Sequence, residues 1–279
     1  MGRLTTGRAG SRPVDDGRMS LVEHLYELRS RLAKSLIAVF VCLVVVFVFW
    51  QPVYDFLRQP YCQTTPGRVN CDLVALGIFD QFKVRLRVSF LGGIVAASPV
   101  WLYQLGAFIT PALHRKERRY AASFLAASLT LFLTGAVFAY LTVARGLEFL
   151  LQVGGGDVIT LVNVQDYLSF VTLCLLAFGI AFEFPVIVLF LHFVGVLSSR
   201  QMRSARRGTV LGIFVAAALI TPSQDPFTFC FMAVPLWLLY EACILVARLR
   251  ERAQRRRAAQ EEHERLDDDV PSRIDTSPL

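Results

Sequence analysis

The stretch SLIAVFVCLVVVFVFWQPVY, residues 35–54, holds twenty consecutive residues without a charged side chain. A helix needs about 20 mostly apolar residues to cross the hydrocarbon core of a bilayer, so this stretch is predicted to span a membrane. The rest of the chain agrees, because 54% of its 279 residues are hydrophobic and 22 are phenylalanine. A soluble domain of this length does not usually bury so much apolar material.

Five further segments have similar length and apolar character. The predicted transmembrane helices are residues 35–54, 88–109, 120–144, 167–196, 208–224 and 227–247. Pro99, Pro185 and Pro235 lie within these segments and are expected to kink them, because proline removes a backbone hydrogen bond. The fifth helix is expected to be short, since residues 209–220 correspond to only about 18 Å of helix. The expected fold class is an all-α polytopic membrane protein, a kinked and concave bundle of six transmembrane helices.

The distribution of basic residues predicts the orientation, because cytoplasmic connections are enriched in Lys and Arg. The connections HRKERR (residues 114–119) and RQMRSARR (residues 200–207) are strongly basic, whereas residues 146–166 and 221–226 contain neither Lys nor Arg. Both termini are therefore expected on the cytoplasmic side. Five basic residues between positions 55 and 87 conflict with this orientation, namely Arg58, Arg68, Lys83, Arg85 and Arg87.

Composition also divides the chain into regions. Residues 1–18 are expected to form a disordered basic tail of little functional weight, and Met19 is an alternative start. Residues 19–250 form the membrane domain, in which residues 55–80 are expected to fold as a small external cap. Pro60, Pro66 and Gly67 argue against one continuous helix in this cap. Residues 251–279 form a charged cytoplasmic tail, expected to begin as a helix and to end in disorder.

Two of the six cysteines, Cys62 and Cys71, share the predicted external cap, whereas the other four lie in apolar segments. An oxidising compartment would allow the two to form a disulfide. Spacing does not establish the geometry that a disulfide needs, so two free thiols under a folded cap remain the alternative.

The motifs argue against an enzyme. The chain contains no HExxH, no GxSxG and no phosphate-binding loop, and its four histidines lack the spacing of metal ligands. GGGD at residues 154–157 matches the GxGD of membrane aspartyl proteases, but no predicted span offers a second aspartate. A glycine-rich external turn explains this stretch better, and no catalytic residue, cofactor or metal is expected.

The stretch VEHLYELRSRL, residues 22–32, precedes the first span and combines a leucine stripe with five ionisable residues. This pattern predicts an amphipathic helix at the membrane interface. Glu27 and Arg31 stand four residues apart in the order that favours a simple surface ion pair. Glu117, the only acid in HRKERR, has the equally simple role of reducing repulsion among the cations around it.

Glu183 lies within the fourth predicted span, in the stretch FGIAFEFPV. A carboxylate at membrane depth costs about 2.5 to 3.5 kcal/mol on insertion scales, so Glu183 is expected to face a cavity, a partner or a proton. A protonated glutamate bonded to a neighbouring helix for structural reasons alone is the alternative.

Three stretches together resemble the TatC family of the twin-arginine translocase: VEHLYELRSRL at residues 22–32, YQLGAFITPALHRKERR at 103–119 and FGIAFEFPV at 178–186. The likeness runs from about residue 19 to residue 250. It implies a receptor for export of folded proteins in the bacterial cytoplasmic (inner) membrane. Such a receptor binds signal peptides with paired arginines and assembles with TatA-type and TatB-type single-span subunits. Transport is driven by the protonmotive force, and the resemblance implies a homo-oligomer within a larger complex and no nucleic acid partner.

The resemblance also assigns roles to residues. It implies that Glu27 and Glu117 receive the two arginines of the signal peptide, which agrees with the strength of guanidinium–carboxylate hydrogen bonds. The remaining matches are Arg29 and Arg31 in the opening motif, Phe108 before the first cytoplasmic loop, Pro60 in the external loop, and Glu183 as the buried acid of the fourth helix.

Departures and rival functions remain. Asp225 matches a family aspartate only with one inserted residue, and Phe229 stands where many relatives have glutamine, so a polar partner contact in the sixth helix is not carried over.

The main rival function is that of a six-helix proton-coupled secondary transporter that uses Glu183. The two halves of the chain show no evident repeat, which many such transporters have. A channel is a third option, but no filter sequence supports it.

Overall fold

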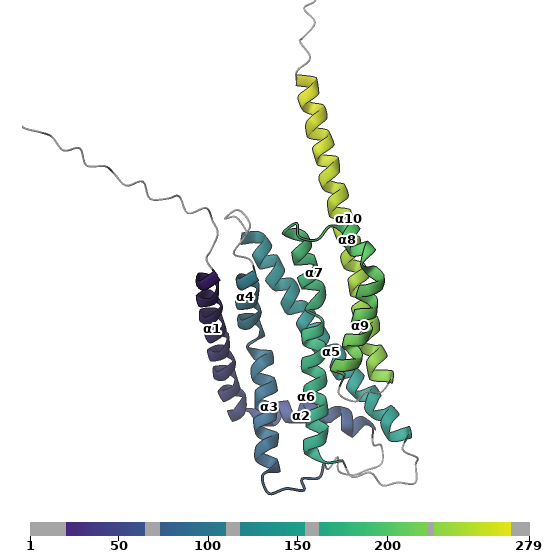
Figure 1. Ribbon diagram of the computed structural model, residues 1–279. Coiled ribbons are helices and arrows are strands. Elements are labelled where there is room, and N and C mark those ends of the chain that lie inside the picture. Colours follow the sequence, from purple (N-terminus) through teal and green to yellow (C-terminus); the bar gives the residue numbers. More distant parts are fainter. Residues whose placement is uncertain (1–20, 65–72, 110–117, 154–161, 222–225, 269–279) are drawn as a thin grey trace, which may run out of the picture.

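The computed structural model describes residues 21–64, 73–109, 118–153, 162–221 and 226–268, and these residues are almost entirely helical (Figure 1). The helices are α1 (Leu21–Val48), α2 (Trp50–Thr64), α3 (Asp80–Ala96), α4 (Ser98–Ile109), α5 (Arg118–Val153), α6 (Val164–Ala181), α7 (Phe184–Phe193), α8 (Ser199–Ser204), α9 (Arg206–Ile220) and α10 (Pro226–Asp268). Within the described ranges, extended pairing is limited to one parallel bridge between Val74 and Asn163. The predicted all-α class is confirmed.

The helices account for the predicted spans in order. By length and apolar composition, four stretches of the described chain can cross a membrane: Val22–Val48, Ala122–Phe149, Val164–Phe193 and Thr228–His263. The pair α3 and α4 forms a further stretch that is bent by 54°. The fifth predicted span corresponds to α9, whose 15 residues extend over about 22 Å. Because a hydrocarbon core is about 30 Å thick, α9 is short, as the sequence predicts.

The first and the last described residues lie at the same end of the bundle (Figure 1). We call this end the near end and the opposite end the far end. The helix α10 continues past the other helices at the near end. Its helical part reaches Asp268, so much of the predicted tail 251–279 is helix. The predicted tail 1–18 lies outside the described residues.

The first predicted span has a different boundary from the one expected. The helix α1 ends at Val48, the chain turns at Phe49, and α2 then runs across the far end of the bundle (Figure 1). The predicted extension of this span to position 54 is therefore wrong. The apolar residues of α2 pack inward instead of continuing through the membrane, and Leu57 and Tyr61 are each only 2% exposed.

Two breaks confirm the predicted kinks at prolines. The turn at Ala97 precedes Pro99 at the start of α4, and the turn at residues 182–183 precedes Pro185 at the start of α7. Proline cannot donate the hydrogen bond that would continue the preceding helix, so the chain bends before it. Pro235, by contrast, lies inside the continuous helix α10.

The packing is uneven around the bundle. The helix α5 packs against α2, α4, α6, α7 and α10, and the main core cluster draws on α2, α3 and α5–α10. The helix α1 has no buried side chain from position 22 to position 48. It leans on α3 at Gly93, where an added Cβ would lie 2.8 Å from the Leu43 Cα. The glycine thus allows close approach of the two helices, while most of α1 stays open to lipid or a partner.

Candidate functional site

A shallow groove separates α1 from α4 at the near end of the bundle. Its volume is about 210 Å³, and its lining surface is almost entirely apolar. The residues that line it are Leu28, Arg31, Leu32 and Ser35 from α1, and Trp101, Gln104, Leu105 and Phe108 from α4. Two of the predicted leucine stripe, Leu28 and Leu32, therefore face this groove, although both are largely exposed.

Glu27 lies beside this groove and is paired with Arg31 through one of its two oxygens. The Arg31 Nε and Nη2 donate to Glu27 Oε1 over 2.9 and 2.5 Å, so the simple ion pair expected from their spacing is formed. The other oxygen, Oε2, is buried and has no hydrogen-bond partner in the described part of the chain. A buried carboxylate oxygen normally accepts at least one hydrogen bond, so Oε2 is expected to have a donor from beyond the described residues.

Phe108 closes the groove at the end of α4. Its ring stacks on the imidazole of His24 with centroids 4.5 Å apart and an interplanar angle of 18°. This contact joins the first turn of α1 to the last turn of α4. Arg29 is exposed on α1 and takes no part in the Glu27–Arg31 pair. The structure thus brings Glu27, Arg31 and Phe108 together, whereas Glu117 lies outside the described residues.

Glu183 lies at the break between α6 and α7 and is 7% exposed. The Ser128 hydroxyl of α5 donates to Glu183 Oε2 over 2.8 Å. Glu183 Oε1 is buried and, within the described ranges, has no hydrogen-bond partner. The bond to α5 is the contact that the structural alternative predicts, a glutamate bonded to a neighbouring helix, and the second oxygen is left without a partner among the described residues.

Close packing of α5 on α6 holds Ser128 near this acid. An added Cβ at Gly135 would lie 2.8 Å from the Phe178 carbonyl oxygen, and one at Gly179 would lie 2.8 Å from the Phe132 ring. Larger residues at these positions would force the two helices apart. Sequence reasoning missed Ser128, because a single serine in an apolar helix carries no signal that would identify its partner 55 positions away.

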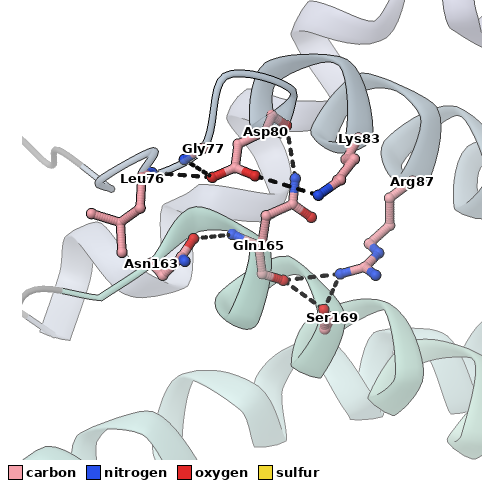
Figure 2. Close-up of polar contacts among 8 residues, drawn as sticks. All are labelled: Leu76, Gly77, Asp80, Lys83, Arg87, Asn163, Gln165 and Ser169. Carbon is pink, nitrogen blue, oxygen red and sulfur yellow. Dashed lines mark hydrogen bonds and ion pairs between the residues drawn. The ribbon is translucent and has the colours of Figure 1, made fainter.

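Asp80 organises the far end, where the segment before α3 meets the start of α6 (Figure 2). Its Oδ2 accepts from the backbone N–H groups of Leu76 and Gly77 over 3.1 and 2.6 Å. Its backbone carbonyl accepts from Gln165 Nε2 over 2.7 Å. Lys83 Nζ lies 3.8 Å from Asp80 Oδ1. This network fixes the return of the cap region onto the bundle.

Two arginines of α3 that conflict with the predicted orientation are used in contacts at the far end. Arg87 donates to the Gln165 carbonyl over 2.9 Å and to the Ser169 hydroxyl (Figure 2). Arg85 donates twice to the Phe47 carbonyl, over 3.0 and 2.8 Å, and its guanidinium lies 4.2 Å from the Phe47 ring centroid. Such contacts satisfy carbonyls at the end of α1. These charges therefore serve the fold, which explains why they deviate from the pattern of the other loops.

The remaining predicted site residues are also at the far end or outside the described part. Pro60 is buried within α2, which passes through this proline without ending. Cys62 lies in the same helix, whereas Cys71 and Asp225 lie outside the described residues, so their predicted roles stay predictions.

Comparisons with known proteins agree on one family. The family model described as Sec-independent protein translocase protein (TatC) matches residues 23–235. A relative of that name from Frankia casuarinae is 43% identical over 274 residues, covering 95% of this chain and 75% of the relative. Another from Aquifex aeolicus is 37% identical over 240 residues, covering 85% of this chain and 98% of the relative. A crystal structure described as the twin arginine translocase receptor TatC in DDM aligns with a TM-score of 0.71 at 37% identity, covering 81% of this chain and 99% of the other.

The family model extends from α1 into the first part of α10 and includes the groove between α1 and α4 and the break at Glu183. These matches confirm the family resemblance of the three sequence stretches. Relatives with this name are protein translocase components, which is not an enzymatic role. We conclude that the chain belongs to the TatC family and is a multi-pass membrane component of the Sec-independent (Tat) protein translocase.

Proposed function

We propose that this chain is the signal-peptide receptor of a twin-arginine translocase in a bacterial cytoplasmic membrane. Its near end faces the cytoplasm and binds the paired arginines of export signals carried by folded cargo. It then assembles with TatA-type and TatB-type single-span subunits, within a larger complex that contains more than one copy of this chain, and the protonmotive force drives transport. The similar crystal structure described as a receptor supports this role.

The main support for the proposal is Glu27 Oε2, a buried carboxylate oxygen that has no hydrogen-bond partner among the described residues. The carboxylate is half-buried, its Oε1 is held by Arg31, and its Oε2 is buried without a partner among the described residues. A guanidinium presents parallel N–H groups that match a carboxylate, and such charge-assisted hydrogen bonds are about twice as strong as neutral ones. An arginine of the signal peptide can therefore donate to Oε2 while Arg31 keeps the carboxylate in place.

A second arginine needs a second acceptor, and Glu117 is the acid that the TatC motif supplies for it. In the sequence, Glu117 immediately precedes Arg118, the first residue of α5. Arg29 and Arg31 surround the site with positive charge, which makes basic peptides without a fitting arginine pair harder to accept. Phe108, fixed by His24, gives the groove an apolar wall for the aliphatic stem of an arginine.

Glu183 has a different role in this proposal. Its Oε1 lies at membrane depth without a partner among the described residues, so a polar group on the single span of a TatA-type or TatB-type subunit would find an acceptor there. Pro60 shapes α2 at the far end, and Asp225 directly precedes α10 in the sequence, so we assign both to this assembly rather than to the peptide.

The test measures the affinity of two synthetic signal peptides for the full chain in lipid nanodiscs. The peptides differ only in the residue pair, which is Arg-Arg (RR) in one and Lys-Lys (KK) in the other. Lysine offers a point charge in place of a planar fork, so we expect the wild type to bind RR about ten-fold more tightly or better. Glu117→Gln keeps the shape and removes the charge, and it should reduce this preference. Glu148→Gln, which removes an exposed acid paired with Arg145 near the far end, should not. Equal affinity of the wild type for RR and KK would reject the proposal.

A further inference from the structure

A pocket rich in arginine lies between α8 and α10 at the near end, away from the groove of α1 and α4. Its volume is about 240 Å³. It is lined by Ser199, Arg200 and Arg203 from α8, and by Arg248, Glu251, Arg252 and Arg255 from α10. Five of these seven residues are therefore positive and one is negative. Like charges gathered at this density repel one another unless an anion lies between them.

Glu251 offsets only one of the five positive charges, and both of its carboxylate oxygens accept hydrogen bonds from α8. It accepts from the Ser199 backbone N–H over 2.8 Å and from the Ser199 hydroxyl over 2.6 Å. In the described part of the chain, no ion pair within 4.0 Å joins Glu251 to any of the five arginines, and none of the arginines pairs with another acid. In addition, Arg248 Nε is buried and lacks a hydrogen-bond partner within the described ranges. A donor of this kind calls for an acceptor from beyond the described residues.

The pocket is held in shape by contacts that involve none of its arginines. Ser198 and Gln201 form a reciprocal capping box at the start of α8. The Tyr240 hydroxyl of α10 donates to the Met202 carbonyl over 2.9 Å and ties α8 to α10. The arginines thus project from two helices whose relative position is fixed, so binding an anion would not require the backbone to be ordered first.

The surroundings place the pocket at a membrane surface. The exposed apolar residues Leu245 and Leu249 of α10 lie next to the arginines in sequence, and Val196 is an exposed apolar residue just before α8. The Arg250 guanidinium lies 4.1 Å from the Phe193 ring centroid at the end of α7. Arginines beside exposed apolar residues are typical of the level of lipid head groups.

We propose that this pocket binds a phosphate-bearing anion, and that its position assigns the phosphate to the head group of an anionic phospholipid. Guanidinium groups of Arg200, Arg203, Arg252 and Arg255 would bind phosphate oxygens through paired hydrogen bonds, and Arg248 Nε would gain its missing acceptor. The acyl chains would lie against the exposed apolar residues beside the pocket. The site goes beyond the proposed receptor function, because it involves neither Glu27 nor Glu117.

The experiment titrates the full-length chain, in a neutral detergent, with phosphatidylglycerol or phosphatidylcholine and counts bound lipid by native mass spectrometry. The wild type is expected to prefer phosphatidylglycerol. The variant Arg248→Gln/Arg252→Gln should lose about five-fold in affinity for each arginine removed. The matched control Arg256→Gln/Arg257→Gln removes the same charge from the same helix but outside the pocket lining, and it should bind as the wild type does. Arg203→Gln, on the exposed face of α8, repeats the test if the double variant fails to fold.

Two results would overturn the proposal. If the pocket pair and the control pair weakened phosphatidylglycerol equally, the arginines would act only as diffuse surface charge. If inorganic phosphate displaced the lipid and the two lipids bound equally, free phosphate would be the ligand and the assignment to an anionic lipid would be wrong.

Discussion

Replacing Glu27 with glutamine is the perturbation that addresses the proposed peptide site most selectively, since the amide keeps the shape of the carboxylate and removes its charge. A hydrogen bond to a charged group contributes about 1.5 to 3 kcal/mol. Arg31 holds Oε1 in the free and in the peptide-bound chain, so its own ion pair cancels from the difference in affinity. The loss is therefore expected to be about 1.5 to 3 kcal/mol, or about ten-fold to over a hundred-fold in affinity.

The assay is a double-mutant cycle between the chain and the peptide. Affinities of the RR peptide and of its two single Arg→Lys variants are measured by fluorescence anisotropy for the wild type and for Glu27→Gln, at one fixed ionic strength because salt screens exposed charges. If Glu27 binds one of the two arginines, Glu27→Gln and the Arg→Lys change at that arginine should show a coupling free energy of about 0.5 kcal/mol or more. The effects of Glu27→Gln and of the Arg→Lys change at the other arginine on the binding free energy should be additive. Glu148→Gln serves as the control and should be additive with both. Additive behaviour of Glu27→Gln with both arginines would refute the reasoning.

Three further changes test other parts of the account. Glu183→Ala should weaken association with the single-span subunits and leave peptide binding intact, and the opposite result would reverse the two assignments. Cys62 and Cys71 should resist thiol labelling in unreduced membranes if they form the predicted disulfide, whereas complete labelling of both would exclude it. Gly93→Ala places a Cβ 2.8 Å from the α1 backbone and should destabilise the chain by about 1 to 3 kcal/mol in thermal unfolding. The control Gly212→Ala meets no atom within 4 Å, and a similar loss there would contradict the packing argument.

Hydropathy and proline positions predicted most of the fold. The breaks before Pro99 and Pro185 and the short α9 follow from local chemistry, because a missing N–H donor or a short apolar run acts where it stands in the sequence. The turn at Phe49 was not predicted, although Pro52 follows it in the first turn of α2 and has no N–H to donate to the Val48 carbonyl. The Phe47 carbonyl near the turn is satisfied by Arg85 of α3, 38 positions away, and this long-range contact has no signal in the sequence.

The candidate site was predictable to the extent that it rests on motifs. The stretch at residues 22–32 identified Glu27 and Arg31, and the spacing of these two residues predicted their ion pair. The open Oε2 of Glu27, the stacking of His24 on Phe108, and the hydrogen bond from Ser128 to Glu183 depend on how separate helices meet. Such contacts carry no periodic signal in a single sequence.

Photocrosslinking from the peptide tests the central claim most directly. A photoreactive residue beside the arginine pair of an export signal is bound to the full chain in nanodiscs, irradiated, and mapped by mass spectrometry. The account predicts crosslinks to residues 22–32 of α1 and to residues 103–119, the two stretches that contain Glu27 and Glu117. Unlabelled RR peptide should suppress these crosslinks, and KK peptide should not. Crosslinks that map to α2 and the far end, or that RR and KK peptides suppress equally, would contradict it.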